Sequence, residues 1–320
     1  QMENSRIKVS VYCITYNHEK YIRDALEGIV KQKTNFRYEV FVHDDASTDN
    51  TQEIVKKKKK KYPGIIFPIL QTENQYSQGI HIFKTHILPK MNGEYIAICE
   101  GDDYWIDEYK IQKQVDFLDN NSEYSACVHN SLVLDLKKHE SRLFNSAYED
   151  YDLKIEHVLT EGGSDYQTAS LMYRKKFADE IFYTKTPDFF SKAKGFGDYP
   201  LAIYLTLSGK VRYFSEIMSA YRVGVCGSWS ERVKDRKKCH EVYNSIINML
   251  LSVDEYTDYK YHMAIQSIVE KYRFWILNSS IGINALKNKE MWLVFKKKRI
   301  SRKVKILIKL LFFNRFFENE

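Results

Sequence analysis

The chain has 320 residues, 44% of them hydrophobic and 14% aromatic, a composition that excludes a disordered protein. Its length predicts two domains rather than one. The net charge of +7 lies at one end, because residues 296–320 hold nine Lys or Arg and two Glu, which leaves the first 295 residues neutral overall. This neutral main body argues against a nucleic-acid-binding face.

The first predicted element is a buried parallel strand over residues 9–14, followed by a polar turn and an amphipathic helix over residues 21–30. The turn, residues 15–20, contains no glycine, which argues against a dinucleotide fingerprint or a phosphate-cradling loop. Its aromatic ring and small polar groups suit a base and a ribose. Capping of the next helix by Asn17 is the alternative, and both can hold.

A second strand, residues 38–43, ends in an acidic turn at residues 44–49. The helix after that turn finishes in six consecutive lysines, residues 56–61, which we interpret as its solvated last turns. A third strand is predicted at residues 65–70 and a weaker helix at residues 81–91. Strands that alternate with helices in this way specify a parallel sheet with right-handed crossovers.

The fourth strand, residues 94–99, leads into Glu100, Asp102 and Asp103, and a helix is predicted over residues 107–120. Ligands of open α/β sheets bind at this carboxyl edge. Crowded carboxylates repel one another unless a cation lies between them, and Mg²⁺ and Mn²⁺ readily take oxygen ligands. The segment therefore predicts a divalent-metal site. A solvated acidic turn that caps the next helix is the alternative.

Three sequence blocks, taken in order, resemble the inverting glycosyltransferases of family 2, which have the GT-A fold. The blocks are residues 10–17, residues 44–49, and residues 93–96 leading into 100–103. The resemblance covers about residues 7–230 and is of the bacterial surface-polysaccharide type. It implies an α/β fold with a Rossmann-like, mostly parallel sheet, helices on both faces of that sheet, and a helical C-terminal region.

The resemblance also implies a nucleotide-sugar donor, most often UDP-linked, and Mn²⁺ or Mg²⁺ as the cofactor. Asp103 would bind the metal, Tyr16 and Asp45 the base, and Asp102 the ribose or sugar. Lys84 stands near the place where the family commonly has an arginine for the donor phosphates. The residues expected to bind the nucleotide sugar are Thr15, Tyr16, Asn17, Glu19, Asp45, Lys84, Glu100 and Asp102. A carboxylate such as that of Asp45 can accept the ring N–H of uracil or of guanine, so the base stays open.

The second half of the catalytic region begins with a strand at residues 124–134, whose His129 we interpret as a buried histidine rather than a ligand. Residues 137–161 are polar and irregular, and residues 164–173 resemble the acceptor-side strand of the family. Asp198 precedes a predicted helix at residues 201–208 and fits its N-cap. The family has its catalytic base in the matching place. Both roles can hold, because a helix N-terminus positions a carboxylate and keeps it ionised.

Two further strands, residues 211–214 and 217–223, are expected to close the catalytic domain. Relatives of this subgroup often follow the Tyr221-Arg222 pair with Val-His, and such a histidine could reach the metal. Gly224 stands in the matching place here. The remaining metal ligands therefore stay open.

The domain prediction is a catalytic domain over residues 7–230, with a nucleotide-sugar half up to about residue 130 and an acceptor half after it, and a helical region over residues 231–320. The tail of that region forms a basic amphipathic helix on a helical wheel. One arc holds Lys298, Arg302, Lys305 and Lys309, and the opposite side holds Ile300, Val304, Leu307, Ile308 and Leu311. Such a helix can lie on an anionic membrane surface. Packing on the protein, or pairing with another copy, is the alternative.

The five cysteines form no CxxC pair, and their odd number and strand-like settings predict reduced, mostly buried thiols. The sequence opens with no signal peptide, and no apolar run reaches the roughly 18 residues that span a bilayer. We therefore expect a cytoplasmic protein, located at the inner face of the plasma membrane through its tail.

The family resemblance, together with the acidic loop, implies an inverting, metal-assisted glycosyltransferase of polysaccharide biosynthesis, such as that of a capsule. It would transfer a sugar from a UDP-sugar to a saccharide or lipid-linked saccharide, with Asp198 as the general base. Two alternatives stay open. One is a nucleotidyltransferase that forms nucleotide sugars, against which the missing glycine-rich loop argues. The other is a catalytically silent carbohydrate-binding protein on the same fold.

Overall fold

The computed structural model describes residues 6–162, 165–194, 196–225, 236–280 and 283–312. Cys226, the predicted helix start at residue 231, and the phenylalanines after residue 312 lie outside these ranges. Contacts within the chain divide it into two units. One unit comprises residues 1–186 and 201–226, and the other comprises residues 187–200 and 227–320.

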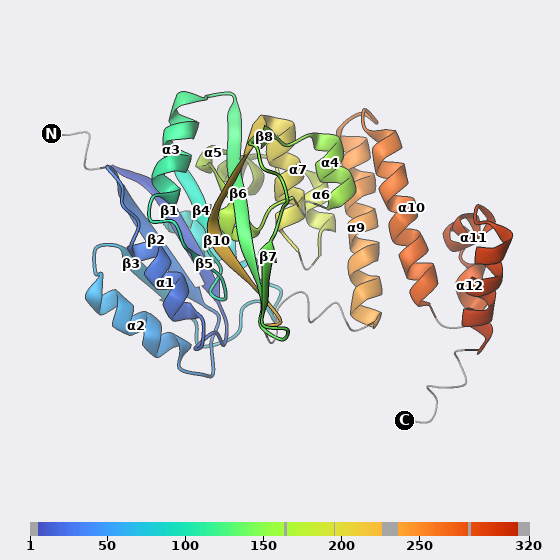
Figure 1. Cartoon of the computed structure of the whole chain (residues 1–320), viewed down its shortest axis with the longest axis horizontal. Coiled ribbons are helices and arrows are strands. Elements are labelled where there is room, and N and C mark those ends of the chain that lie inside the picture. The colour runs from blue at the N-terminus through green and yellow to red at the C-terminus, as the bar shows by residue number, and fades with distance from the viewer. Residues whose placement is uncertain (1–5, 163–164, 195, 226–235, 281–282, 313–320) are drawn as a thin grey trace. The chain divides into compact units, whose positions relative to one another are not determined.

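A mixed sheet forms the centre of the first unit (Figure 1). Its strand order is β3-β2-β1-β4-β9-β6-β10-β5, with β7 beside β6 and β8 beside β10. The strands are β1 (Ile7–Thr15), β2 (Arg37–Asp44), β3 (Ile66–Leu70), β4 (Tyr95–Ile98), β5 (Tyr104–Trp105), β6 (Tyr124–Asp135), β7 (Glu140–Leu143), β8 (Tyr151–Asp152), β9 (Met172–Arg174) and β10 (Lys210–Val223).

The predicted parallel arrangement is confirmed for the first four strands of this order. Strand β1 pairs in parallel with both β2 and β4, and β2 pairs in parallel with β3. The sheet becomes mixed at β9, which is antiparallel to both β4 and β6. Strand β10 runs parallel to β6 and unites the two strands that were predicted at residues 211–214 and 217–223. Its register shifts between Phe214 and Ile217.

The helices of the first unit are α1 (Ile22–Val30), α2 (Thr51–Lys61), α3 (Lys110–Asn120), α4 (Ile155–Glu161), α5 (Lys175–Asp179) and most of α7 (Asp198–Ser208). Of these, α1 and α3 bury the apolar faces that were predicted within residues 21–30 and 107–120. Leu26 of α1, Val55 of α2 and Val115 of α3 share one buried cluster with Val11 and Val40 of the sheet. The predicted helix at residues 81–91 is a π-helical turn, Phe83–Ile87, followed by a 3₁₀ turn, Leu88–Lys90. Pro89 has no N–H to donate to a continuing α-helix.

Buried polar and sulfur side chains in this unit agree with the sequence analysis. Cys13, Cys99 and Cys127 are buried free thiols, whose pKa values burial raises. His129 is fully buried on β6, with its Nδ1 2.7 Å from the main-chain oxygen of Asn130. Burial lowers the pKa of its imidazole well below the ordinary value. These four side chains therefore belong to the core.

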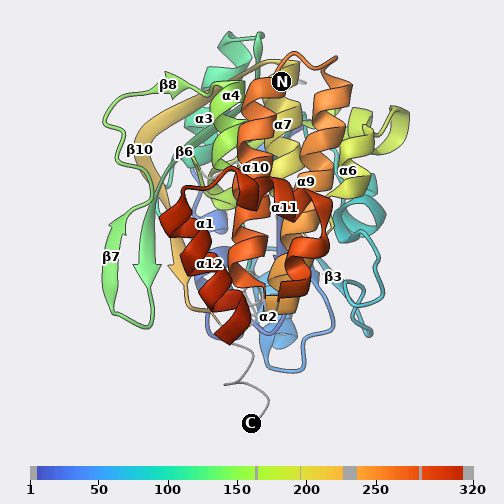
Figure 2. The same ribbon diagram turned by 90° about the vertical axis from the view of Figure 1, so that its right-hand side faces the viewer.

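The second unit is helical. Its helices are α6 (Asp188–Lys192), α9 (Arg236–Tyr256), α10 (His262–Ser279), α11 (Lys289–Lys296) and α12 (Ile300–Phe312), with a 3₁₀ turn, η6 (Ile283–Lys287), before α11. Helices α9 and α10 run side by side (Figure 1, Figure 2) and bury Met249, Leu250, Ile265 and Ile268 from the predicted apolar stripes. Within the described ranges, no helix combines the length and apolar character needed to cross a bilayer.

Candidate active site

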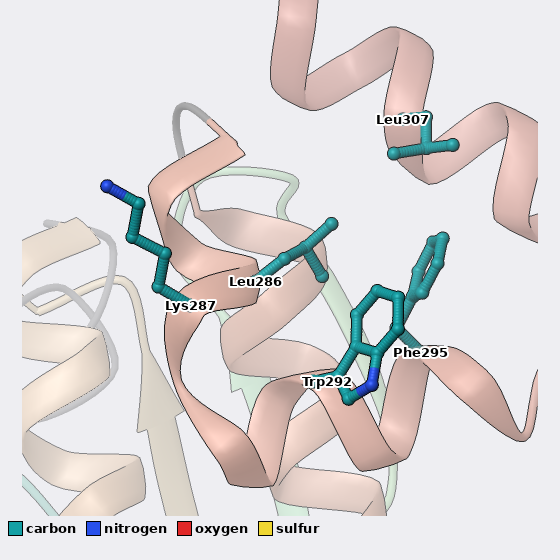
Figure 3. Close-up of a pocket in the computed structure, with 5 residues that line it drawn as sticks. All are labelled: Leu286, Lys287, Trp292, Phe295 and Leu307. Atoms are coloured by element: carbon teal, nitrogen blue, oxygen red, sulfur yellow. The ribbon is translucent and has the colours of Figure 1, made fainter.

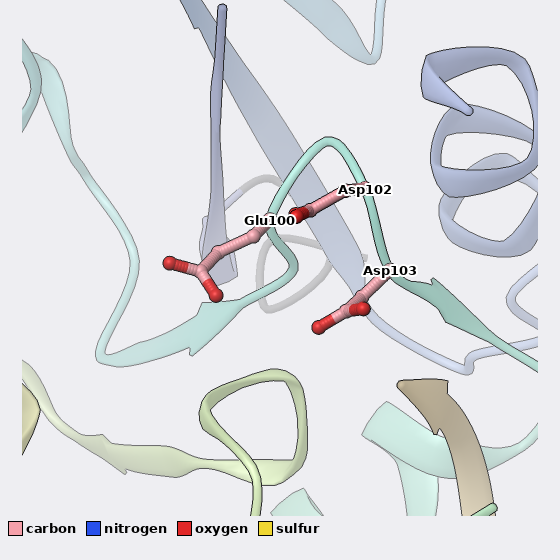
Figure 4. A group of neighbouring side chains, drawn as sticks. All are labelled: Glu100, Asp102 and Asp103. Atoms are coloured by element: carbon pink, nitrogen blue, oxygen red, sulfur yellow. The ribbon is translucent and has the colours of Figure 1, made fainter. Parts of the chain in front are cut away.

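Three carboxylates gather on the loop between β4 and β5 (Figure 4). Glu100, Asp102 and Asp103 each place one oxygen within 4.8 Å of the others. Two oxygens on opposite sides of one Mg²⁺ ion are about 4.2 Å apart, because each Mg–O distance is about 2.1 Å. The cluster therefore fits a single divalent cation without large movement of its side chains.

Asp103 is the buried member of this cluster, with 1% of its surface exposed. Its Oδ1 accepts a hydrogen bond of 2.9 Å from the main-chain N–H of Arg222. Burial, followed by the charges of Asp102 and Glu100, raises the pKa of the Asp103 carboxyl well above its ordinary value. A carboxylate in this environment is destabilised until a cation offsets the negative charge. The electrostatics of the loop thus favour metal binding.

Gly101 allows the acidic loop to approach the end of β1. A Cβ atom at this position would lie 2.6 Å from Thr15 Oγ1 and 2.8 Å from His18 Nδ1. Both of these polar atoms are buried and have no hydrogen-bond partner among the described residues. Burial lowers the pKa of the His18 imidazole, although the negative charge of Asp102 opposes this shift. His18 is therefore a neutral polar group beside the acidic loop.

The turn after β1 is tied to the turn after β2 because these strands are parallel neighbours. Asn17 Oδ1 accepts a 2.8 Å hydrogen bond from the N–H of Thr48, and Glu19 Oε2 accepts a 3.0 Å hydrogen bond from the N–H of Asn50. Tyr16 leaves 44% of its surface exposed. The structure thus brings the turns at residues 15–19, 44–51 and 100–103 to one sheet edge. Asn17 and Glu19 brace that edge, and Tyr16 offers its ring to solvent.

Asp45 anchors the loop after β3. Its two carboxylate oxygens accept hydrogen bonds from the main-chain N–H groups of Gln75 (2.7 Å) and Tyr76 (3.1 Å). The residue is buried, so contact with a base would use the lone pairs that remain on these oxygens. Lys84 lies exposed on the π-helical turn. The nucleotide-sugar roles assigned to both residues stay predictions.

Arg222 of β10 holds the acidic loop in place and was not identified as a site residue from the sequence. Its guanidinium donates a 2.8 Å hydrogen bond to the main-chain oxygen of Asp102 and pairs at 2.5 Å with Asp24 of α1. The same group lies 4.5 Å from the ring centre of Tyr104. Arg222 therefore holds the loop through both its main-chain N–H and its guanidinium.

Replacing Arg222 with methionine should lower the free energy of unfolding by about 1–3 kcal/mol, because the part-buried carbonyl of Asp102 and the ring of Tyr104 lose their cationic partner. The half-exposed Asp24 carboxylate adds little to this figure. Urea unfolding measures the change. Arg142→Met is the control, since Arg142 is exposed on β7 and donates a 3.2 Å hydrogen bond to the main-chain oxygen of the neighbouring Leu143, and should cost less than about 1 kcal/mol. Equal losses in the two variants would contradict a special role for Arg222.

Asp198 is the first residue of α7, three residues earlier than the predicted helix start. Its Oδ1 accepts a 2.9 Å hydrogen bond from the N–H of Tyr199. Desolvation raises the pKa of the Asp198 carboxyl, and this hydrogen bond opposes the rise. Desolvation and the hydrogen bond at the N-terminus of α7 thus shift the pKa of Asp198 in opposite directions. Its role as a base stays a prediction.

Gly224 has a φ of +91°, a backbone conformation that side chains rarely adopt. A Cβ atom here would also lie 3.3 Å from Lys137 Cγ. The backbone thus suits glycine and would strain a histidine in this place.

Comparison with known proteins gives a consistent result. The family described as glycosyl transferase family 2 matches residues 10–182. An uncharacterized protein of Mycobacterium tuberculosis (strain H37Rv) is 32% identical over 271 residues, which cover 84% of this chain and 74% of that protein. The poly(ribitol-phosphate) beta-N-acetylglucosaminyltransferase TarS of Staphylococcus aureus is 36% identical over 118 residues, covering 36% of this chain and 19% of TarS.

Solved structures of S. aureus TarS 1-349 share the fold. The complex with UDP-GlcNAc matches with a TM-score of 0.60 and 17% identity, covering 94% of this chain and 80% of that chain. The complex with UDP matches with a TM-score of 0.56 and 18% identity, covering 93% of this chain and 78% of that chain. The likeness at this level of identity establishes the GT-A architecture, an α/β sheet followed by helices.

Proposed function

The chain belongs to glycosyl transferase family 2, and we propose that it transfers a sugar from a UDP-linked donor to a hydroxyl group of a saccharide or lipid-linked saccharide, with inversion at the anomeric carbon. Membership of this family makes the protein a glycosyltransferase, which supports transfer over the nucleotidyltransferase and silent-binding alternatives. The single observation that carries the proposal is the cluster of Glu100, Asp102 and Asp103 beside the turn after β1.

The donor would lie across the edge where the three turns meet. The exposed ring of Tyr16 offers a stacking surface to the base, and Asp45 offers an acceptor to a uracil N–H. TarS has been solved with UDP and with UDP-GlcNAc, which supports a uridine nucleotide here. Asp102 would contact the ribose or sugar, and Lys84 the phosphates.

Asp103 would hold the cofactor, Mn²⁺ or Mg²⁺, with Glu100 and Asp102 close enough to assist. The bound ion would stabilise the negative charge that develops on the departing diphosphate. The raised pKa of Asp103 fits this role, because a buried carboxylate among like charges gains most from a cation. Arg222 would keep the loop in the conformation that presents these groups.

Asp198 would act as the general base. It would remove the proton of the acceptor hydroxyl while that oxygen attacks the anomeric carbon on the side opposite the leaving diphosphate. General-base catalysis contributes typically 10²- to 10⁴-fold, and positioning of the two substrates supplies much of the rest.

The name of one relative supports a class of acceptor. The name of TarS specifies a polymeric acceptor, poly(ribitol-phosphate). We propose that the acceptor of this chain is likewise a bacterial surface polysaccharide, capsule included, or its lipid-linked precursor. A lipid-linked acceptor would place the reaction at the inner face of the plasma membrane.

A thermal-shift panel of nucleotides tests the donor and the metal together. UDP and UDP-sugars with Mn²⁺ should raise the melting temperature, because a ligand at 100 times its Kd stabilises the folded protein by about 2.7 kcal/mol. ADP and GDP should leave the melting temperature unchanged. EDTA should abolish the shift. A shift of equal size in EDTA would contradict the metal assignment, and a preference for GDP would contradict the uridine assignment. Release of UDP that depends on an added acceptor then confirms transfer.

A further inference from the structure

Helix α12 packs within the second unit in an orientation that a helical wheel does not anticipate. Ile306 and Leu310 are buried, whereas Ile300, Val304 and Ile308 are 79%, 48% and 51% exposed. These three residues are spaced four apart, so they form one apolar stripe along the outer face of the helix. An exposed stripe of this kind on a surface helix indicates an interaction site.

Cations on the opposite side explain the orientation. The ring centre of Phe274 on α10 lies 5.0 Å from Arg302 and 4.7 Å from Lys298. Glu270, also on α10, forms ion pairs with Lys297 and Lys298. Part of the predicted basic arc therefore faces the protein. The predicted apolar side faces solvent, apart from Leu307, which lines a cavity. The side chains of Lys309 and Leu311 lie outside the part of the chain that the structure describes.

That cavity adjoins the stripe and has apolar walls. Leu286, Trp292, Phe295 and Leu307 line an open hollow of about 430 Å³, with Lys287 at its side (Figure 3). Trp292 is itself half exposed, and tryptophan is enriched at membrane–water interfaces. The space and the stripe together offer an apolar surface with room for part of an acyl chain.

We propose that the outer face of α11 and α12 docks on an anionic lipid bilayer. The charge of the chain supports this occupant, because residues 296–320 carry the whole net charge of +7. Lys296 at the end of α11, Arg299 just before α12 and Lys305 on α12 are exposed. They would meet lipid phosphates while the apolar side chains enter the interface. A second copy of the chain fits less well, because a two-fold pairing would bring the same positive charges together. The bilayer contact is independent of the donor chemistry proposed for the first unit.

Sedimentation of the full chain with vesicles tests the proposal. The protein should sediment with equal parts of phosphatidylglycerol and phosphatidylcholine, and remain in solution with phosphatidylcholine alone. Ile300→Ser/Val304→Ser/Ile308→Ser should lower the bound fraction at least about tenfold, since the stripe supplies the apolar contact. The exposed positions allow this change without opening a core cavity. Met263→Ser, at an exposed apolar residue of α10, is the matched control and should bind normally.

Charge reversal separates the electrostatic contribution. Lys296→Glu/Lys305→Glu should lower vesicle binding at least about tenfold, since each basic residue near an anionic surface adds about fivefold. Lys57→Glu/Lys60→Glu, two exposed lysines of α2, is the control with the same change in net charge. UDP-dependent thermal shifts should be unchanged in all four variants, so loss of the donor site is distinguishable from loss of docking. Equal sedimentation of all variants would overturn the proposal. A dimer of the wild type that the apolar variant loses would also overturn it, and would assign the face to a second copy.

Discussion

Asp103→Asn should lower turnover at least about 10³-fold, the largest loss expected from any single substitution in this chain. The change keeps the size of the side chain and an oxygen that can accept the 2.9 Å hydrogen bond from Arg222 N–H. It removes the negative charge that would hold the cation at the departing diphosphate. Acceptor-dependent UDP release measures turnover, and UDP titration with Mn²⁺ or EDTA measures binding. The affinity of the variant for UDP should be the same in Mn²⁺ as in EDTA.

The same substitution should leave the protein folded. Burial and two neighbouring carboxylates raise the pKa of Asp103, so its ionised form destabilises the fold at neutral pH in the absence of a cation. A neutral amide avoids that cost, and the melting temperature should stay level or rise. Asp116→Asn, on the exposed side of α3, is the control and should retain full turnover. Mn²⁺-dependent UDP binding by Asp103→Asn would show that the metal lies elsewhere.

The nucleotide half of the fold could be predicted because its signals are local. Buried runs such as residues 9–14 and 94–99 give strands, and the periodic apolar faces of α1 and α3 give helices that must cover them. Strand β10 was predicted as two strands because Ser215 and Glu216 interrupt its apolar pattern. The structure shows the reason for the interruption: the N–H of Ser215 donates to Asp150 at 2.8 Å, and the register of β10 shifts there.

The candidate site could be predicted only in part, because only some of its residues are neighbours in the sequence. Glu100, Asp102 and Asp103 are neighbours in sequence, so their proximity follows from the chain itself. Arg222 reaches the same loop from a strand about 120 residues later, and no local pattern specifies such a contact. His18 carried a signal, a histidine three residues after a strand end, but its burial beside Gly101 is a tertiary feature.

The orientation of α12 shows a second limit of sequence reasoning. A helical wheel separates the faces of a helix but does not say which face packs. Here the stacking of Arg302 on Phe274 and the burial of Ile306 decide it, and both depend on the position of α10. The exposed apolar stripe is thus a property of the folded unit rather than of the segment.

Asp198→Asn should lower turnover at least about 10²-fold while UDP binding with Mn²⁺ stays within a factor of about three, because the amide cannot accept the proton of the acceptor hydroxyl. It can still accept the hydrogen bond from Tyr199 N–H, so α7 should keep its N-terminus. Asp188→Asn is the matched control, since Asp188 is also the first residue of a helix, α6. It should retain full turnover.

The pH dependence of kcat/KM provides an independent test of Asp198. A base acts only when deprotonated, so activity should fall as the pH drops through its pKa, and desolvation raises that pKa above the ordinary value for aspartate. The wild-type profile should therefore lose activity at a higher pH than an aspartate of ordinary pKa would cause. The residual activity of Asp198→Asn should lack this acid limb. If the limb persists, or if turnover survives within about threefold, Asp198 only caps α7, and another group takes the proton from the acceptor.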